Sequence, residues 1–183
     1  MIVDVHTHVG EYPGHISEQF AAEARGAWAE AEIGGTLDEH FRDALADVDR
    51  AIVLAFNARA AGFVVPNDYV AAYVARDPSR LLGFGSVDPS DRGALDELER
   101  MKHELGLGGC KLGPIYQNVD PLSGDFLRIC EALQRLDLPM LIHQGTTFSR
   151  AGSLLKAHPL LLDEIALRYP RLKIVIAHVG HPW

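Results

Sequence analysis

Three of the apolar runs in this sequence end in histidine, and imidazole is the commonest side-chain ligand for metals in proteins. The first run ends in VDVHTH, which places His6 and His8 two residues apart. In a regular strand, side chains at i, i+2 and i+4 project the same way, so Asp4 would share their face. Two neighbouring imidazoles can fill two positions on one ion. The pair therefore predicts a metal site where the first strand ends.

Two more histidines close later apolar runs, His143 in PMLIHQG and His178 in KIVIAHVG. A single histidine of this kind is more often an ordinary core residue than a ligand. Parallel strands, however, end at the same edge of a sheet, so three such strand ends should converge. His181 follows in the loop GHPW, and we expect it to be a loop residue or a residue that contacts the metal ligands without binding the metal. We expect the remaining histidines to be solvated, namely His15, His40, His103 and His158.

Lys111 is the other candidate for chemistry, because it lies in the glycine-flanked run GGCKLGP. Gly109 and Gly113 share its face and would leave room for a substrate to approach. A buried ammonium group requires an anion nearby. Two functional interpretations follow: Lys111 binds a substrate carboxylate, or it bridges metals as a carboxylated lysine. A lysine that extends to solvent is an equally weighted alternative.

The elements that position these residues alternate between short β-branched runs and amphipathic stretches, which is typical of βα units on a parallel sheet. The expected strands are 2–6, 51–56, 81–87, 109–112, 139–143 and 173–178. The expected helices are 36–48, 67–75, 91–105, 124–136 and 159–169, from apolar residues at three-to-four spacing. Thr36 precedes Glu39 by three residues, which predicts a capping box.

The segment 10–35 departs from this alternation as a long excursion after the first strand. Its centre, SEQFAAEARGAWAEAE, is rich in alanine and glutamate. We expect a short helix there, lying over the mouth of the site. The sequence has no linker or low-complexity tract, so residues 1–183 are predicted to form one domain.

Composition narrows the function further, since 48% hydrophobic and 23% charged residues are typical of a globular domain. The net charge of −8 and the absence of a basic run argue against nucleic acid as a partner. The sequence shows neither a leader nor about 18 uninterrupted apolar residues, so we expect a cytoplasmic protein with no membrane association. Cys110 and Cys130 lack metal-site spacing and are expected to be buried thiols.

Five motifs together resemble the amidohydrolase superfamily, in particular the amidohydrolase-2 group that includes relatives of aminocarboxymuconate-semialdehyde decarboxylase. The motifs are VDVHTH, SVDP, GCKLGP, LIHQG and IVIAHVGHPW, in that order. The resemblance implies a (β/α)8 TIM barrel and one divalent ion, zinc above all, held by His6, His8 and His143. It also implies that His178 is an acid/base or water-orienting catalytic group.

The resemblance further implies a part that this sequence does not contain. The family completes its metal site with an aspartate after the eighth strand, whereas the sixth predicted strand here ends five residues before Trp183. A closed barrel needs about 250 residues. We therefore expect an incomplete barrel with six of the eight βα units, and a fragment of a longer gene product. Completion of the barrel by a second copy or a partner is the alternative.

Three functions fit these observations. The first is a metal-dependent hydrolase, in which the ion lowers the pKa of bound water towards roughly 7 so that it cleaves a small ester, lactone or amide. The second is a non-oxidative decarboxylase of a small aromatic or unsaturated carboxylic acid, in which Lys111 pairs with the substrate's anion. The third is a catalytically silent metal-binding module. The expected partners are a small-molecule substrate, which is anionic in the second function, and further copies of the chain where these complete the barrel.

Overall fold

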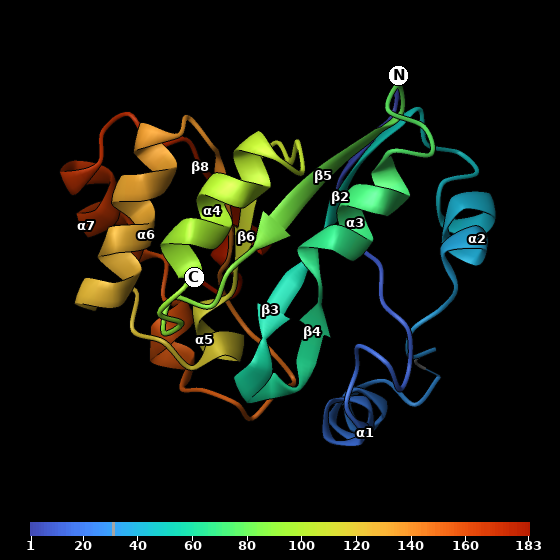
Figure 1. Cartoon of the computed structure of the whole chain (residues 1–183). Helices are drawn as coiled ribbons and strands as arrows, with labels where there is room; N and C mark the ends of the chain where they lie inside the picture. The colour runs from blue at the N-terminus through green and yellow to red at the C-terminus, as the bar shows by residue number, and fades with distance from the viewer. Residues whose placement is uncertain (31) are drawn as a thin grey trace.

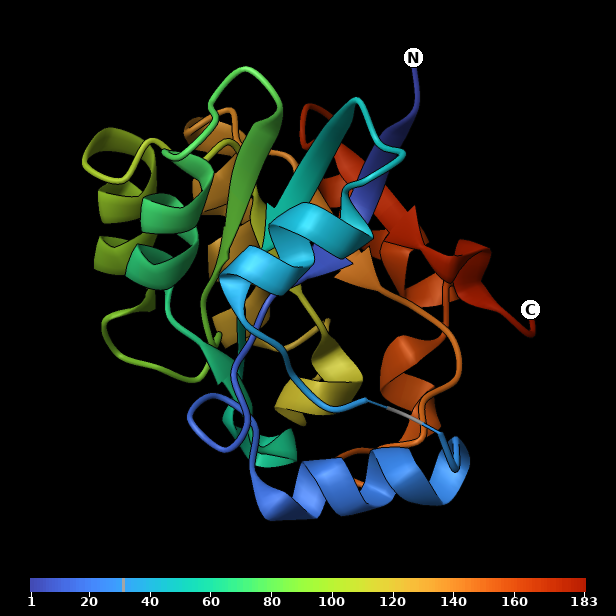
Figure 2. The ribbon, with the colours of Figure 1, turned by 90° about the vertical axis from the view of Figure 1, so that its right-hand side faces the viewer.

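Six parallel strands form one curved sheet in the computed structural model, which describes residues 1–30 and 32–183 (Figure 1). The strands are β1 (Val3–His8), β2 (Arg50–Leu54), β5 (Leu81–Ser86), β6 (Cys110–Leu112), β7 (Met140–His143) and β8 (Ile174–Ala177). They are ordered β1-β2-β5-β6-β7-β8, and each neighbouring pair is parallel. The sheet curls into part of a barrel, as the sequence predicts (Figure 2).

Helices cover the outer face of this sheet, and Figure 1 shows α4, α6 and α7 gathered on one side of it. The helices are α1 (Glu18–Ala27), α2 (Leu37–Glu39), α3 (Asn67–Val74), α4 (Ala94–His103), α5 (Pro114–Gln117), α6 (Gly124–Arg135) and α7 (Leu160–Arg168). In α6, Phe126, Ile129, Cys130 and Leu133 are buried at the spacing of one helix face. Ser123 caps this helix by accepting a hydrogen bond from the Phe126 amide.

The helix expected at 36–48 is shorter and changes its winding. Its predicted capping box is present, because the Thr36 hydroxyl accepts from the Glu39 amide and the Glu39 carboxylate accepts from the Thr36 amide. After α2 the chain widens into a π-helical turn, His40–Ala44, in which the Leu45 amide donates to the His40 carbonyl. Single π turns occur frequently at functional sites.

A second, two-stranded sheet was not predicted. The chain leaves β2 and forms an antiparallel hairpin from β3 (Phe56–Ala58) and β4 (Phe63–Val65). Gly62 has a φ of 78°, a conformation that glycine adopts without steric penalty. The Ser17 amide donates to the Gly62 carbonyl over 2.8 Å, so the excursion that carries α1 is attached to the hairpin.

The core lies on both faces of the curved sheet. Between sheet and helices, side chains such as Val53, Leu98, Met101 and Ile142 are completely buried. On the concave face a smaller cluster contains Leu54, Phe84, Leu141 and Ala177. The free cysteines, Cys110 and Cys130, are both buried, as expected.

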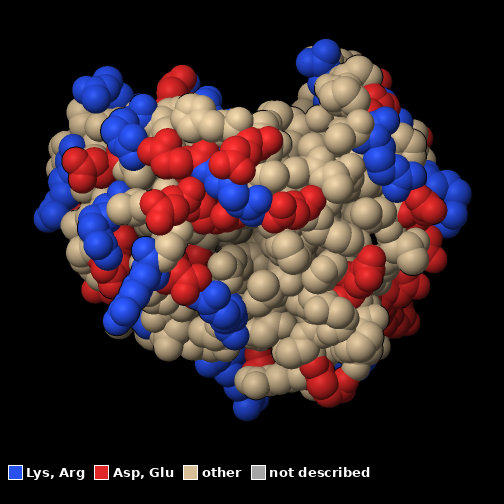
Figure 3. Space-filling view, in the orientation of Figure 1, with Lys and Arg blue, Asp and Glu red and all other residues tan. Residues whose placement is uncertain are grey.

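The two ends of the sheet are open in the described residues, because neither β1 nor β8 has a second strand beside it. Apolar side chains there are correspondingly exposed, at 52% for Val5 and 44% for Val175. No helix in the described residues is long and apolar enough to cross a membrane. Lys and Arg are interspersed with Asp and Glu on the face seen in Figure 3, which shows no continuous basic region.

Candidate metal centre and its cavity

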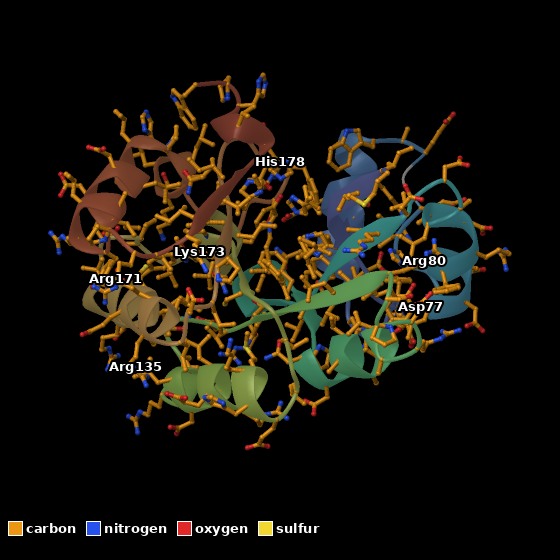
Figure 4. All side chains as sticks on the ribbon, turned by 90° about the horizontal axis from the view of Figure 1, so that it is seen from above. Asp77, Arg80, Arg135, Arg171, Lys173 and His178 are labelled. Atoms are coloured by element: carbon orange, nitrogen blue, oxygen red, sulfur yellow. The ribbon has the colours of Figure 1, made fainter. Side chains whose placement is uncertain are left out.

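Four histidines meet at the ends of three strands. β1 carries His6 and His8, β7 ends in His143, and His178 begins a 3-10 turn directly after β8. The ring centroids are 5.2 Å apart for His6 and His8, and 4.9 Å apart for His178 and either His6 or His143. In Figure 4 the His178 side chain lies between the end of β8 and the N-terminal part of the chain. The convergence expected from parallel strands is therefore present.

The expectation that Asp4 shares the face of these histidines is wrong. The register of β1 against β2 shifts between Asp4 and Thr7, so β1 is not a regular strand. Consecutive residues Val5 and His6 both line the cavity, whereas Asp4 does not. Such a bulge reverses which residues face inward, because regular alternation is lost at the extra residue.

The backbone at His178 is unusual. Its φ is 58° and that of Val179 is 45°, both in the left-handed region. This region is rare for residues other than glycine and is most unfavourable for a β-branched side chain. Strained backbone of this kind concentrates at functional sites, where surrounding contacts hold it in place.

Three of the histidine rings are neutral at physiological pH. Burial, with the neighbouring Lys111 as the next cause, lowers the pKa of His6 to about 3 and that of His143 to about 3. The same causes lower the pKa of His8 well below its ordinary value. A neutral imidazole is the form that binds a metal ion.

The donor groups fit a metal, although they are not preassembled. His8 Nδ1 and His143 Nε2 are buried without a hydrogen-bond partner, which is unusual for polar atoms and is the state a bound cation would relieve. Within residues 1–30 and 32–183, however, no three His, Cys, Asp or Glu side chains already stand close enough to hold an ion. Metal binding would therefore require the imidazole rings to reorient.

Lys111 is inside the cavity and not in solvent. Its side chain is 1% exposed, and its Nζ lies 3.2 Å from Nε2 of His6. The Phe56 ring centroid is 5.8 Å from Nζ. Burial lowers the pKa of Lys111 to about 7. The alternative in which this lysine extends to solvent is thus wrong for this structure.

The glycines beside Lys111 have a different role from the one expected. A Cβ atom at Gly109 would collide with the ring of Phe84, and one at Gly113 would collide with the ring of Phe56. The space that these glycines leave is therefore filled by aromatic side chains of the protein. Their absence of side chains allows β6 to pack closely against its neighbours.

The histidines and Lys111 line a cavity of about 690 Å³. Its other walls combine aliphatic side chains, such as Ile16, Leu141 and Ile176, with six aromatic ones, Phe20, Trp28, Phe56, Phe63, Tyr116 and Phe148. Helix α1 contributes Phe20, whose ring centroid lies 5.1 Å from that of Phe148. The Arg150 amide, in the loop after β7, donates to the Glu23 carboxylate of α1 over 3.1 Å. The helix expected over the mouth of the site is therefore present and is tied to the opposite loop.

A family model described as amidohydrolase, of the amidohydrolase-2 group, matches residues 3–183. The chain belongs to the amidohydrolase family. Among curated proteins, gamma-resorcylate decarboxylase from Polaromonas sp. strain JS666 is 29% identical over 140 residues. That match covers 62% of this chain and 43% of the relative, so the chain spans less than half of the relative's length.

Solved structures confirm the fold, an incomplete (β/α)8 TIM barrel with six of its eight βα units. An uncharacterised TIM-barrel protein from Bordetella bronchiseptica aligns with a TM-score of 0.77 at 17% identity, over 100% of this chain and 68% of that one. A dihydroxybenzoic acid decarboxylase from Polaromonas sp. JS666, with bound manganese and the inhibitor 2-nitroresorcinol, aligns with a TM-score of 0.66 at 21% identity. That alignment covers 98% of this chain and 65% of the other.

Sequence reasoning missed one residue of the site, Tyr116, and misplaced three histidines outside it. Tyr116 packs its ring 4.8 Å from that of His143, and its only sequence signal is its position just after the fourth predicted strand. His15, His40 and His158 were expected to be solvated but are half-buried, and His40 is hydrogen-bonded to both Thr7 and Tyr73. The residues that make the Tyr116 and His40 contacts are far apart in sequence, so no local pattern could indicate those contacts.

The neutral histidines predict that the metal-free chain loses stability in mild acid. The pKa of a histidine is about 6.5 in the unfolded chain, and that of His143 is about 3 in the folded chain. Between these values the unfolded state binds more protons, so the free energy of unfolding falls as pH decreases. At pH 5 the loss from His143 alone is about 2 kcal/mol.

Urea unfolding at pH 7 and pH 5, without metal, measures this loss. In a His143→Gln variant, the difference between the two pH values should shrink by about that 2 kcal/mol, since no proton can be taken up at this position. An identical pH dependence in the variant and the unmodified chain would contradict the neutral state of His143.

Proposed function

We propose that the protein carrying this chain is a metal-dependent, non-oxidative decarboxylase of a small aromatic carboxylic acid. The observation that carries this proposal is the buried Lys111 amine beside His6, in an apolar cavity to which six aromatic rings contribute. A carboxylate attached to an aromatic ring matches both features, since the ammonium group pairs with the anion and the rings pack against its ring. The similarity to gamma-resorcylate decarboxylase supports the same reaction class.

His6, His8 and His143 would hold one divalent ion. When bound, the ion supplies positive charge that stabilises negative charge on the substrate's oxygen atoms. Zinc is the metal that the sequence resemblance implies, whereas the dihydroxybenzoic acid decarboxylase of similar fold contains manganese. Imidazole ligands suit zinc, whereas manganese prefers oxygen ligands, so the identity of the metal has to be measured.

Two side chains of this chain take part in the reaction, Lys111 in binding the substrate and His178 in proton transfer. Lys111 binds the carboxylate and fixes the position of the aromatic ring against the walls of the cavity. His178 is exposed to solvent at the cavity edge, and burial together with Lys111 lowers its pKa, so its ring takes up a proton from water and delivers it to the ring carbon that bears the carboxylate. The bond between that carbon and the carboxylate then breaks, its electron pair stays with the ring, and carbon dioxide leaves. No oxidant or reductant is needed.

Hydrolysis, which the sequence suggested first, would use the same side chains to direct water at an ester, lactone or amide. Product analysis separates the two reactions. The manganese- or zinc-loaded protein should convert 2,6-dihydroxybenzoate to resorcinol and carbon dioxide and should leave aromatic lactones intact. Lactone opening without any carbon dioxide release would refute the decarboxylase proposal.

Replacing Lys111 by methionine should weaken this activity while preserving the fold. A hydrogen bond to a charged group contributes about 1.5–3 kcal/mol, so kcat/KM should fall about 10- to 100-fold. Lys102→Met, on the exposed side of α4, is the matched control and should leave kcat/KM unchanged. Unaltered kinetics in Lys111→Met, with normal thermal unfolding, would remove Lys111 from substrate binding.

A further inference from the structure

The register shift in β1 does more than interrupt a strand, because it decides where His6 points. Val3 and Asp4 pair with Arg50 and Ala51, while Thr7 pairs with Val53, so β1 carries one extra residue between the two positions. As a result His6 and His8 both reach the cavity, and Asp4 and Thr7 lie off it. Bulges of this kind re-aim side chains next to active sites.

Asp4 holds the bulge at its start. Its Oδ1 accepts a hydrogen bond of 2.9 Å from the backbone amide of His6. A bulged residue loses its regular ladder partner, and an aspartate two residues earlier can accept from the freed amide. The carboxylate therefore fixes the backbone of the very residue whose ring must face the cavity.

His40 holds the bulge at its end. Its Nε2 lies 2.8 Å from the Thr7 hydroxyl and its Nδ1 lies 2.7 Å from the Tyr73 hydroxyl. Tyr73 is 1% exposed, so this end of the chain of hydrogen bonds is anchored in the core. Thr7 sits between the two candidate ligands, and fixing its side chain fixes the peptide groups on both sides.

The elements around His40 are suited to this task. His40 is the first residue of the π turn. The helix before it begins four residues earlier, at the capping box that Thr36 and Glu39 form. The Asp4 carboxylate lies close enough to His40 to raise its pKa, although burial is the larger effect and lowers it. Asp4, Thr7 and His40 therefore lie together on one side of β1, and the cavity lies on the other.

We propose that Asp4 and His40 are positioning residues that aim the imidazoles of His6 and His8 from the far side of β1. Neither touches the substrate or the ion, and His40 acts through Thr7. The expected effect on metal binding rests on the proposed metal centre, whereas the expected effect on the position of the rings rests on the bulge alone. Outer groups that orient metal ligands typically change metal affinity 10- to 100-fold when they are removed.

The test compares matched pairs of variants. Thr7→Val has the shape of threonine without its hydroxyl, whereas Thr7→Ser keeps the hydroxyl. Asp4→Ala loses the acceptor, whereas Asp4→Asn keeps an Oδ1 atom. His40→Leu removes both ring hydrogen bonds, and because His40 acts through Thr7, combining it with Thr7→Val should add nothing to Thr7→Val alone.

The first readout needs no metal. Crystal structures of metal-free Thr7→Val and Asp4→Ala should show the His6 ring displaced from its place 5.2 Å from the His8 ring, with Thr7→Ser and Asp4→Asn unchanged. Unmoved rings in Thr7→Val and Asp4→Ala would overturn the proposal, whether or not the chain binds metal. This separates its failure from a failure of the proposed function.

The second readout is binding of cobalt as a spectroscopic probe. Thr7→Val and Asp4→Ala should bind Co²⁺ about 10-fold or more weakly and with an altered visible spectrum, and the conservative partners should restore both. Ser123→Ala, which removes the cap of α6, controls for general destabilisation and should leave the spectrum unchanged. Equal affinity and spectra within each pair would also contradict the proposal.

Discussion

Replacing His6 and His8 together by alanine should reduce the metal content of the purified protein from about one ion per chain to none. Both residues belong to β1, and their rings stand 5.2 Å apart on the same wall of the cavity. Without them His143 remains as the only member of the proposed ligand set, and one imidazole does not retain a divalent ion through dialysis. Mass spectrometry of the metal content after dialysis measures the change.

A matched double variant makes the loss interpretable. His103→Ala and His181→Ala together remove two exposed histidines that do not line the cavity. This variant should keep its metal. Retention of a full equivalent by the His6 and His8 variant would place the ion elsewhere and would end the proposal for this centre.

Residues 1–183 expressed on their own should self-associate. β1 and β8 both lack a neighbour on one side in the described residues, and unpaired strand edges favour pairing with other chains. Val5, Val175 and Ile176 are exposed at 52%, 44% and 42% along these two strands, which adds apolar surface to the open backbone. Size-exclusion chromatography with light scattering should therefore show oligomers at micromolar concentration.

Charges placed on the open strands should reverse this association. Val3→Lys on β1, combined with Ile176→Lys on β8, should shift the chain towards monomer, since charged residues on edge strands oppose pairing. Leu167→Lys on α7 replaces an apolar residue that is more exposed, at 71%, but lies away from both edges, and it should have no effect. A monodisperse, cooperatively unfolding monomer from the unmodified chain would show that the sheet ends are protected in another way.

The parts of the fold that follow from local pattern could be predicted from the sequence. Alternating β-branched and amphipathic runs locate all six strands of the large sheet, with differences of one or two residues at their ends. The convergence of His6, His8, His143 and His178 needs only that parallel strands end together. The side chains of Thr36 and Glu39 form their capping box because that motif is local in sequence.

The remaining features depend on contacts between distant residues, which no local pattern contains. The bulge that turns Asp4 away is stabilised by groups up to 33 residues apart, in the contact between Thr7 and His40. The β3–β4 hairpin forms where a strand was expected to end at Phe56. Lys111 is buried because Phe56 and Phe84 fill the space beside its glycine neighbours, a packing that only the folded chain reveals.

The most direct test of the central claim is a crystal structure of the protein soaked with Mn²⁺, with anomalous differences recorded at the manganese edge. The account predicts one strong peak in the cavity, within bonding distance of ring nitrogens of His6, His8 and His143. It also predicts that the His8 Nδ1 or His143 Nε2 atoms, now without partners, gain one. A peak outside the cavity, or an empty cavity at saturating Mn²⁺ and Zn²⁺, would contradict it.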